Sequence, residues 1–252
     1  MNSKKQKLLT PLLKSQTSNW NKSNGRNTNN GHNTAWHRGG GHIRLYRNVD
    51  LKRHSTQGII AGIEYDPNRS GFIARIFNPD AKKKTYIIAP TNVKKGDIIR
   101  SNPTINGIQN GHSKTLKYIF TGTSIYNLSV VPGKNGKILR AAGSSGQRVK
   151  KTNKLAKKRL KSGQCRWFDI KTMATTGIVS NSNYCLIKLK KAGQSRWLGE
   201  RPIVRGVAMN PIDHPHGGGE GKTSGGRPAV TPRGKPTKGY PASPHRYPKN
   251  PS

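Results

Sequence analysis

The middle of the chain alternates short apolar runs with turn residues. GIIAGIEY (58–65) and GFIARIF (71–77) flank the turn sequence DPNRSG, and this arrangement predicts a β-hairpin. Similar runs recur at intervals of about 10–15 residues, which is typical of small antiparallel barrels and not of βαβ units. The further runs of this first set are 84–89, 97–100, 116–120 and 125–131.

A second set of strand-like runs extends from Gly136 to Ser180. Its members are 136–143, 146–151, 156–160, 165–170 and 175–180. The segment NYCLIKLKKAG (183–193) differs, because Leu186 and Leu189 have helical spacing and Gly193 is suited to end a helix. The sequence therefore predicts a mainly β protein with one helix over 183–193.

Both ends of the chain lack the pattern of a packed domain. Residues 1–34 are rich in Asn, Lys, Ser and Thr and contain no acid, which is typical of an extension that is disordered without its partner. Residues 215–252 contain 8 Gly and 8 Pro, so they cannot bury enough apolar surface to offset the entropy of ordering. The expected organisation is a basic extension (1–34), a first barrel domain (35–123), a second barrel domain (124–199) and an extended arm (200–252).

The net charge of the chain indicates which class of partner it binds. The chain has 47 Lys and Arg against 9 Asp and Glu, a formal net charge of +38, and no acid precedes Asp50 or follows Glu220. A fold with this charge repels itself, so a polyanion is the expected partner and nucleic acid the favoured one. A membrane surface is the weaker alternative, because the apolar runs are far shorter than the ~18 residues that span a bilayer.

The cysteines and tryptophans give weaker signals. Cys165 and Cys185 lie 20 residues apart without a Cys-x-x-Cys pair, which argues against a zinc ribbon or a disulfide framework and favours two small buried thiols in a reducing compartment. Trp167 and Trp197 each follow an Arg beside a strand or helix pattern, so packing within the fold is favoured over stacking on bases for both.

The segment MNPIDHPHGGGEG (209–221) concentrates residues that can bind metals. His214 and His216 point the same way in an extended chain, and Asp213 and Glu220 could add oxygen ligands. A catalytic metal also needs rigid ligands and second-shell support, which a glycine triplet does not supply. GGGEGKTS also falls short of a nucleotide phosphate-binding loop, because position 216 is His and no strand or helix pattern flanks it.

Insertion into folded RNA explains the same residues better. Glycines let the backbone approach phosphates closely, and imidazoles bond to base edges and 2′-hydroxyls. WHRGGGHIR (36–44) repeats this pattern, and a basic run over 148–161 contains no acid, which favours phosphate contact. The candidate RNA-binding residues of these two segments are His37, Arg38, Gly39, Gly40, Gly41, His42, Arg44, Arg148, Lys150, Lys151, Lys157, Lys158 and Arg159.

Longer blocks of the chain resemble one family. RGVAMNPIDHPHGGGEGKTSGGRPAVTPRGKPTKG (205–239) is similar to the C-terminal signature of the universal L-two family of large-subunit ribosomal proteins, and its DHPHGGGEG block is very specific. Other blocks follow the family order, so the resemblance covers nearly the whole chain. These are GRNTNNGHNTAWHRGGGHIRLYRNVDLKR (25–53), IEYDPNRSGFIARI (63–76), YIIAPTNVKKGD (86–97), VPGKNGKILRAAGS (131–144) and KAGQSRWLGERPIVRG (191–206).

This resemblance implies an oligonucleotide-binding (OB) barrel followed by an SH3-like barrel, with arms threaded into the large ribosomal RNA. In the family the C-terminal loop approaches the peptidyl-transferase region, and the protein supports subunit association and tRNA placement. The catalytic centre there is RNA, so we expect a structural subunit and not an enzyme. The implied partners are large-subunit rRNA, neighbouring ribosomal proteins and the small subunit, with Mg²⁺ associated only with the bound RNA and no free homo-oligomer.

The resemblance also assigns residues. His214 is implied as an RNA contact near the peptidyl-transferase region, accompanied by Asp213, His216, Gly217, Gly218, Gly219 and Glu220. The further rRNA contacts that the matching blocks suggest are Arg26, Lys52, Arg53, Arg69, Arg140, Arg196, Trp197, Arg201, Arg205 and Lys222.

The chain departs from the family pattern in places. Arg233 in TPRG stands where the family usually has Trp, which is consistent with transcript editing by a single C-to-U change. The tail YPASPHRYPKNPS lacks the strongly basic end of bacterial members, and 101–115 match only loosely. The sequence of residues 191–206 is more similar to that of mitochondrial members than to that of bacterial or plastid members. We therefore expect a mitochondrion-encoded protein without a cleaved transit peptide.

Two alternatives from other classes stay open on the sequence. One is a metal-dependent nucleic-acid hydrolase that uses His214, His216 and Asp213, for which stoichiometric bound metal would be the sign. The other is a nucleoid-type DNA-packaging protein, which would bind duplex DNA as tightly as structured ribosomal RNA.

Overall fold

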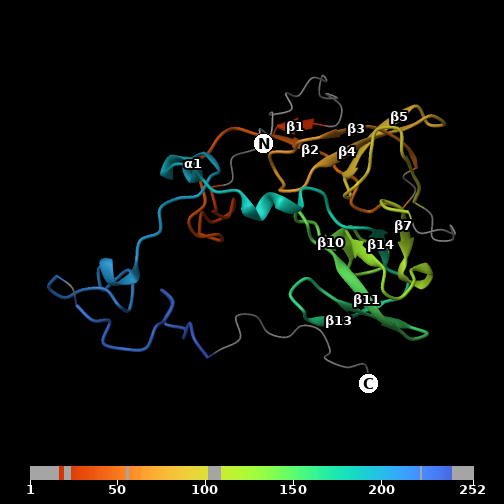
Figure 1. The fold of residues 1–252 in the computed structure, drawn as a ribbon. Helices are drawn as coiled ribbons and strands as arrows, with labels where there is room; N and C mark the ends of the chain where they lie inside the picture. The colour runs from red at the N-terminus through yellow and green to blue at the C-terminus, as the bar shows by residue number, and fades with distance from the viewer. Residues whose placement is uncertain (1–16, 20–23, 55–56, 102–108, 222, 240–252) are drawn as a thin grey trace. The chain divides into compact units, whose positions relative to one another are not determined.

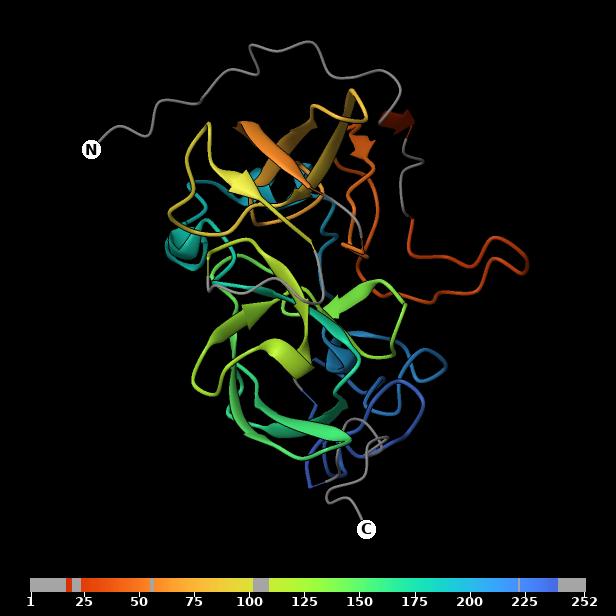
Figure 2. The same ribbon diagram turned by 90° about the vertical axis from the view of Figure 1, so that its right-hand side faces the viewer.

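The computed structural model describes residues 17–19, 24–54, 57–101, 109–221 and 223–239. These residues fall into two compact units. Unit 1 covers 17–19 and 43–188 of the described chain, and unit 2 covers 24–42 and 189–239. Figures 1 and 2 show that unit 1 holds the sheets.

The first sheet of unit 1 has the strand order β5-β4-β3-β6, with all neighbours antiparallel. The predicted hairpin is confirmed: β3 (Gly58–Glu64) pairs with β4 (Ile73–Asn78), with Ile60 opposite Ile76. Strands β5 (Lys83–Ile88) and β6 (Ile98–Ile99) complete the sheet, as the runs at 84–89 and 97–100 predict. Its core is formed by Ile60, Ala74, Ile76, Ile87, Ala89 and Ile99.

The second sheet has the order β13-β12-β11-β8-β14-β7. Its strands are β7 (Ser113–Thr115), β8 (Ser124–Tyr126), β11 (Gly146–Lys151), β12 (Leu155–Arg159), β13 (Cys165–Asp169) and β14 (Met173–Thr176). A short pair, β9 (Leu128–Ser129) with β10 (Gly136–Ile138), accompanies it. The strand expected at 116–120 is wrong, because Leu116–Tyr118 form a 3₁₀ turn whose Leu116 packs into the core.

The two sheets of unit 1 pack against each other. The Tyr126 hydroxyl donates to the Ile88 carbonyl oxygen at 3.1 Å, and the Ser180 amide donates to the Ala89 carbonyl oxygen at 3.0 Å. An apolar cluster that includes Tyr86, Tyr126 and Val179 fills the space between them. Burial of both sheets against each other confirms the mainly β prediction.

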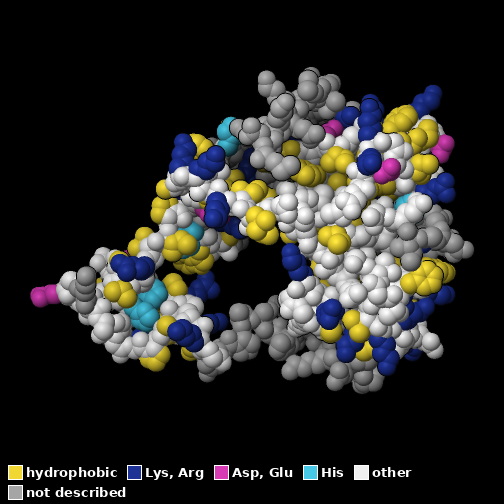
Figure 3. Space-filling view, viewed as in Figure 1, with side chains coloured by type: hydrophobic (Ala, Val, Ile, Leu, Met, Phe, Trp, Pro, Cys, Tyr) yellow, Lys and Arg dark blue, Asp and Glu magenta, His cyan; other side chains and the backbone are white. Residues whose placement is uncertain are grey.

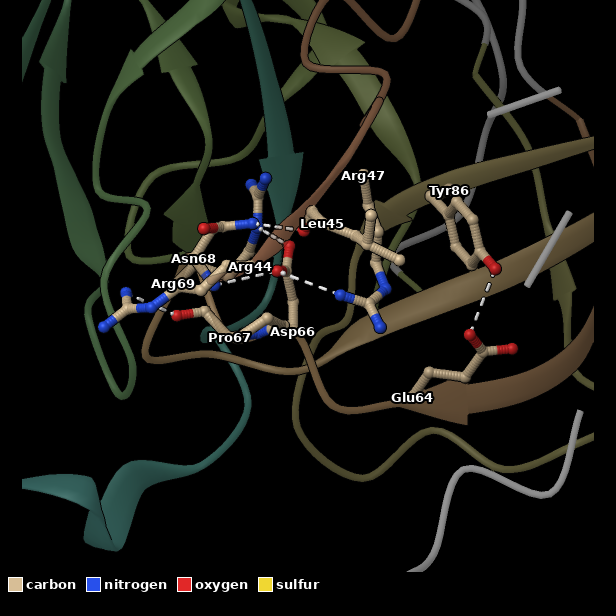
Figure 4. Close-up of polar contacts among 9 residues, drawn as sticks. All are labelled: Arg44, Leu45, Arg47, Glu64, Asp66, Pro67, Asn68, Arg69 and Tyr86. Atoms are coloured by element: carbon tan, nitrogen blue, oxygen red, sulfur yellow. Dashed lines mark hydrogen bonds and ion pairs between the residues drawn. The ribbon is translucent and has the colours of Figure 1, made fainter. Parts of the chain in front are cut away.

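A buried carboxylate connects β2 (Leu45–Arg47) to the turn of the hairpin (Figure 4). Asp66 is fully buried and forms ion pairs with Arg69 at 2.6 Å and with Arg47 at 3.5 Å. Arg47 ends β2, which pairs with β1 (Thr17–Asn19). The Asn68 side-chain amide donates to the Leu45 carbonyl oxygen at 2.7 Å. The turn is therefore fixed by charge as well as by its sequence.

Near this turn a second carboxylate is bound from two sides. Glu64 accepts a hydrogen bond from the Tyr86 hydroxyl at 3.1 Å and pairs with Arg75 at 3.1 Å. Burial, followed by the charge of Glu64, raises the pKa of Tyr86 to about 12. The phenol therefore stays protonated and donates.

The predicted helix over 183–193 is wrong. Ser182–Leu186 form a 3₁₀ segment (η3), and the α-helix α1 covers Ala192–Trp197, so that Gly193 lies in the first turn of the helix instead of ending it. Leu186 is 72% exposed and Leu189 is also exposed. Helical spacing of two leucines has no stabilising effect without a surface to pack against.

Unit 2 contains little regular structure besides α1 and a 3₁₀ turn at Gly206–Ala208 (η4). Isolated bridges join Arg26 to Asn33, Arg38 to Glu200 and Val230 to Pro236. The Thr231–Lys235 turn closes through the Thr231 amide and the Lys235 carbonyl oxygen at 2.8 Å, and it holds Arg233. Short local hydrogen bonds therefore connect the described part of the arm, and the expectation that it orders only with a partner stays a prediction.

Two further expectations concern thiols and boundaries. Cys165 and Cys185 are free and exposed, so the interpretation of both as buried thiols is wrong. Cys165 begins β13, the outermost strand of its sheet, where no layer covers it. The boundary expected at 123/124 stays a prediction, although β7 at Ser113–Thr115 already belongs to the second sheet.

Candidate nucleic-acid interface

The first glycine triplet packs its backbone against the end of α1. The Gly39 amide donates to the Gly199 carbonyl oxygen at 3.0 Å, and the His42 amide donates to the Trp197 carbonyl oxygen at 3.0 Å. A Cβ atom on Gly41 would lie 2.9 Å from Gly199 Cα. Gly41 has φ +82°, a conformation that suits glycine. The triplet therefore brings two distant parts of the sequence into backbone contact within unit 2.

Side chains around this contact carry the expected basic groups. The Arg201 amide donates to the His37 carbonyl oxygen at 2.9 Å, and the His37 ring donates from Nδ1 to the Pro202 carbonyl oxygen at 3.1 Å. The Arg196 guanidinium donates to the Glu200 carbonyl oxygen at 2.6 Å. Arg26, Arg38, Arg196, Arg201 and Arg205 are all exposed. The structure thus brings together, within unit 2, candidates that lie up to about 180 residues apart in sequence.

Trp197 lies outside any core. Its side chain is 57% exposed, and the Lys191 ammonium lies 4.4 Å from the centroid of its ring. The expectation that Trp197 packs inside the fold is therefore wrong, and an exposed ring suits the alternative role as a stacking surface. Trp167, by contrast, is partly buried, with the Lys157 ammonium 5.8 Å from its ring centroid.

The second glycine triplet belongs to a compact loop. The Asp213 and His214 amides both donate to the Asn210 carbonyl oxygen, at 3.0 and 3.3 Å, and the Gly218 amide donates to the Met209 carbonyl oxygen at 3.1 Å. A Cβ atom on Gly217 would lie 2.3 Å from the Asn210 carbonyl oxygen. The interpretation of this triplet as a flexible hinge is therefore wrong, because glycine is needed here for close packing.

The two histidines of this loop contact each other. The His216 amide donates to His214 Nδ1 at 3.0 Å, and the ring centroids are 4.9 Å apart with a 58° tilt. His214 is buried, and a Cβ atom on Gly206 would lie 2.5 Å from its ring. Because Nδ1 already accepts a hydrogen bond, only Nε2 of His214 remains for another partner. The exposed residues of the loop are Asn210, Pro211, Ile212, Asp213, Gly219, Glu220 and Gly221.

Metal chemistry has no support in this geometry. Among the described residues, no group of three or more His, Cys, Asp or Glu side chains is placed to hold a metal ion. The segment after Gly221 does not continue as a helix over 223–228, so the phosphate-binding loop of a nucleotide site is also not formed there. Lys222, a candidate RNA contact, lies outside the described residues.

The basic run over 148–161 divides between the two faces of its sheet. Lys150, Lys151 and Arg159 are exposed and can meet phosphates. Arg148 and Lys158 lie opposite each other in register and are both buried. The strand period of two places every second side chain inside, so the proposal of a phosphate contact loses its geometric basis for these two residues.

These two buried cations have few partners. Arg148 donates from Nη1 to the Leu116 carbonyl oxygen at 3.3 Å, whereas Lys158 Nζ has no hydrogen-bond partner among the described residues. Burial, followed by the charge of Arg148, lowers the pKa of Lys158 to about 7. Burial also lowers the pKa of Arg148.

Arg53 has a structural position as well. Its guanidinium is buried and donates to the Ser101 hydroxyl at 3.1 Å and to the Gly111 carbonyl oxygen at 2.9 Å, and burial lowers its pKa. Arg69 pairs with Asp66, as described above, and Arg44 donates to the Pro67 carbonyl oxygen at 3.0 Å. Lys52 and Arg140 are exposed. Sequence position alone does not separate such structural arginines from surface ones.

Sequence reasoning missed two exposed residues of unit 2. Trp36 is 58% exposed and precedes His37 in the glycine-triplet segment, and Lys191 covers the Trp197 ring. An aromatic residue in a segment without apolar periodicity was the available signal for Trp36. Figure 3 shows Lys and Arg side chains spread over the visible face, with few acidic ones between them.

Comparison with known protein families shows which family the chain belongs to. The model described as "Ribosomal Proteins L2, RNA binding N-terminal domain" matches residues 13–101, and that of "Ribosomal Proteins L2, C-terminal domain" matches 109–234. The chain belongs to the ribosomal protein L2 family. The two sheets of unit 1 fit the OB and SH3-like barrels expected of that family. It is a family of structural proteins, and the match does not support the hydrolase alternative.

Individual relatives agree with the family. The chain is 52% identical over 222 residues to "Large ribosomal subunit protein uL2m" of Reclinomonas americana, which covers 87% of this chain and 79% of that protein. It is 51% identical over 219 residues to "Large ribosomal subunit protein uL2" of Wolbachia pipientis subsp. Culex pipiens, covering 86% and 80%. The protein of the same name from Rickettsia felis is 50% identical over 229 residues, covering 90% and 83%. Mitochondrial and bacterial L2 proteins are thus about equally similar to it.

In the described ranges, no helix reaches the length and apolar character needed to cross a bilayer.

Proposed function

We propose that this protein is a structural subunit of the large ribosomal subunit that binds large-subunit rRNA. The observation that carries the proposal is the match of both L2 domain models, which together extend from residue 13 to residue 234. The net charge of +38 supplies the counter-charge that such an RNA needs. Exposed basic side chains on unit 1, such as Lys150, Lys151 and Arg159, bind phosphates, while the folded arms of unit 2 insert into the RNA.

The loop over 209–221 is the part that we assign to the peptidyl-transferase region. Its backbone is held by its own hydrogen bonds, and His214 is fixed by Gly206 and by the His216 amide. A preformed loop of this kind contacts RNA through its exposed backbone and through Asp213 and the rim glycines, without taking part in chemistry. Support for subunit association and tRNA placement follows from that position.

We place the protein in mitochondrial ribosomes. The similarity to the Reclinomonas americana uL2m protein favours this placement, as does the sequence of residues 191–206. The comparable identity of the Rickettsia and Wolbachia proteins agrees with a gene of bacterial descent. Fractions of purified mitochondria, plastids and cytosol, probed separately for the protein, test the placement directly.

Sedimentation combined with crosslinking tests the function. The tagged chain is run from a native lysate on a sucrose gradient at physiological magnesium, and the crosslinked RNA is then mapped. Co-sedimentation with the large subunit, with crosslinks from 209–221 near the peptidyl-transferase region, is expected. Sedimentation as free protein or with DNA contradicts the proposal.

Charge-matched variants refine this experiment. If about 15 basic groups meet phosphates, binding to free rRNA has a log–log salt slope of about −13. Changing Lys150, Lys151 and Arg159 together to Gln should reduce the slope by about 3, roughly one per lost phosphate contact. The control changes Lys150 and Lys151 to Arg, which keeps the charge and should keep the slope.

A further inference from the structure

Unit 2 contains a cleft that brings several of its exposed basic residues together. Its volume is about 270 Å³, and it lies between the loop that follows Asn24 and the segment that includes Arg201. The side chains that matter for its chemistry are Asn24, Arg26, Asn33, Trp36, Arg38 and Arg201.

The first wall of the cleft is a closed loop. Asn27 donates from its amide to the His32 carbonyl oxygen at 2.9 Å, and the Ala35 amide donates to the Gly25 carbonyl oxygen at 3.0 Å. Gly25 has φ +70°, and a Cβ atom there would lie 2.3 Å from the Ala35 carbonyl oxygen. The Arg26 guanidinium donates to the Gly31 carbonyl oxygen at 3.2 Å across the loop. Backbone hydrogen bonds thus hold this wall in place.

The second wall is tied to the same segment. The Arg38–Glu200 bridge and the hydrogen bond from the Arg201 amide to the His37 carbonyl oxygen, at 2.9 Å, join residues 37–38 to 200–201. Pro202 accepts from the His37 ring at 3.1 Å, which fixes the imidazole at the rim. Because both walls are held by main-chain contacts, the cleft exists before any ligand binds.

The lining combines three kinds of group that recognise a nucleotide. Arg26, Arg38 and Arg201 supply guanidinium groups for phosphate oxygens, and none of the described residues that line the cleft is acidic. The Asn33 side-chain amide supplies donors and an acceptor for a base edge. Asn24 supplies only its NH₂ donors, because its Oδ1 already accepts a hydrogen bond from the Arg26 amide at 3.0 Å. Trp36, 58% exposed, supplies a stacking face. A volume of about 270 Å³ is at the small end of ligand sites, so it suits one nucleotide and not a duplex.

We propose that this cleft holds a single unpaired nucleotide of the bound RNA, with its base on Trp36 and its phosphate against the guanidinium groups of Arg38 and Arg201. The inference rests on the proposed function, because it identifies which part of the rRNA this site takes. Contact with duplex phosphates alone would leave the exposed Trp36 ring and the Asn33 side-chain amide without a ligand.

The test uses the full chain and deproteinised large-subunit rRNA transcribed in vitro. Affinity is measured over a range of salt, and the reactivity of each base is mapped by chemical probing. Trp36→Leu should weaken binding roughly 5- to 150-fold, the range that stacking of one base on an aromatic ring contributes. The salt slope should not change, because no charge is lost. One unpaired base that the wild type protects should become reactive, and Trp36→Phe should restore most of that protection.

Controls separate the proposal from its alternatives. Phe120→Leu removes another exposed ring, on unit 1, and should leave both affinity and probing unchanged. Arg38→Gln should weaken binding and reduce the salt slope by about one. If Trp36→Leu behaves like Phe120→Leu while Arg38→Gln still weakens binding, the cleft binds phosphate only and the proposal is overturned, although rRNA binding stands.

Two other results also overturn it. A Trp36→Leu defect that appears only when other ribosomal proteins are present identifies a protein segment as the occupant. Failure of the wild type to prefer large-subunit rRNA over unrelated RNA contradicts the proposed function itself.

Discussion

Replacing Lys158 by Met tests the most unusual feature of the SH3-like sheet. The Lys158 side chain is 0% exposed, its ammonium has no hydrogen-bond partner among the described residues, and Arg148 lies opposite it in register. Burial and the like charge lower its pKa from 10.5 to about 7. Met has similar length and no charge, so it fills the same space without the cost of desolvation.

The size of the effect follows from proton linkage. The unfolded chain binds more protons than the folded chain between pH 7 and pH 10.5, so the wild type becomes more stable as pH rises through this window. The penalty of the buried ammonium is fully present below pH 7 and is gone above pH 10.5. At about 1.4 kcal/mol per pH unit, the shift of the Lys158 pKa from 10.5 to about 7 amounts to about 5 kcal/mol in all. Lys158→Met should therefore be more stable than the wild type near neutral pH, and its advantage should shrink as pH rises.

Urea unfolding of the free chain at several pH values between 7 and 10, followed by tryptophan fluorescence, measures this difference. Comparison of two chains cancels the titration of all shared groups. Lys157→Met is the matched control, because it removes the same charge from the neighbouring position, where the ammonium lies 5.8 Å from the Trp167 ring centroid. Parallel stability curves for the wild type and Lys158→Met, or a loss of stability at pH 7, would refute the reasoning.

Three other substitutions test packing and charge. Asp66→Asn leaves Arg47 without its counter-ion in a buried site and should cost about 3 to 5 kcal/mol in urea unfolding, whereas an unchanged midpoint would mean that the ion pairs are dispensable. Gly206→Ala places a Cβ atom 2.5 Å from the His214 ring and should weaken the crosslinks from 209–221 to rRNA without changing the stability of unit 1; retained crosslinks would contradict this role for His214. Gly41→Ala places a Cβ atom 2.9 Å from the opposite backbone at a residue with φ +82°. It should speed amide hydrogen exchange at His42 by disrupting the hydrogen bond from the His42 amide to the Trp197 carbonyl oxygen. Exchange at the wild-type rate would show that this segment shifts at little cost.

Local signals explain what the sequence predicted well. The hairpin of β3 and β4 has apolar runs and a turn sequence within about 20 residues, so both determinants are visible together. The helix over 183–193 failed because spacing between Leu186 and Leu189 says nothing about whether a partner surface exists. Periodicity predicts a structure only where burial follows from it.

The candidate site shows the same distinction. Arg26, Arg38 and Arg201 stand out as basic residues in the sequence, but their common cleft depends on backbone contacts between segments that are far apart along the chain. Arg53, Arg148 and Lys158 have the same composition signal but are buried. A run of like charges does not reveal that β11 and β12 turn Arg148 and Lys158 inward, and Arg53 is buried from a segment outside the strands. The role of the glycines in 217–219 depended on the positions of Asn210 and Pro211, which composition does not give.

The division of unit 2 between residues 24–42 and 189–239 has a consequence for how the protein is made. During synthesis, residues 24–42 leave the ribosome first, but their hydrogen-bond partners near Gly199 do not yet exist. At 5–20 residues per second, residues 43–188 take roughly 10 to 30 s to be translated, long enough for a small domain to fold. The barrels of unit 1 therefore fold first, and residues 24–42 pair with residues 189–239 last. Completion of the chain therefore sets the time at which unit 2 can form, after the barrels have folded.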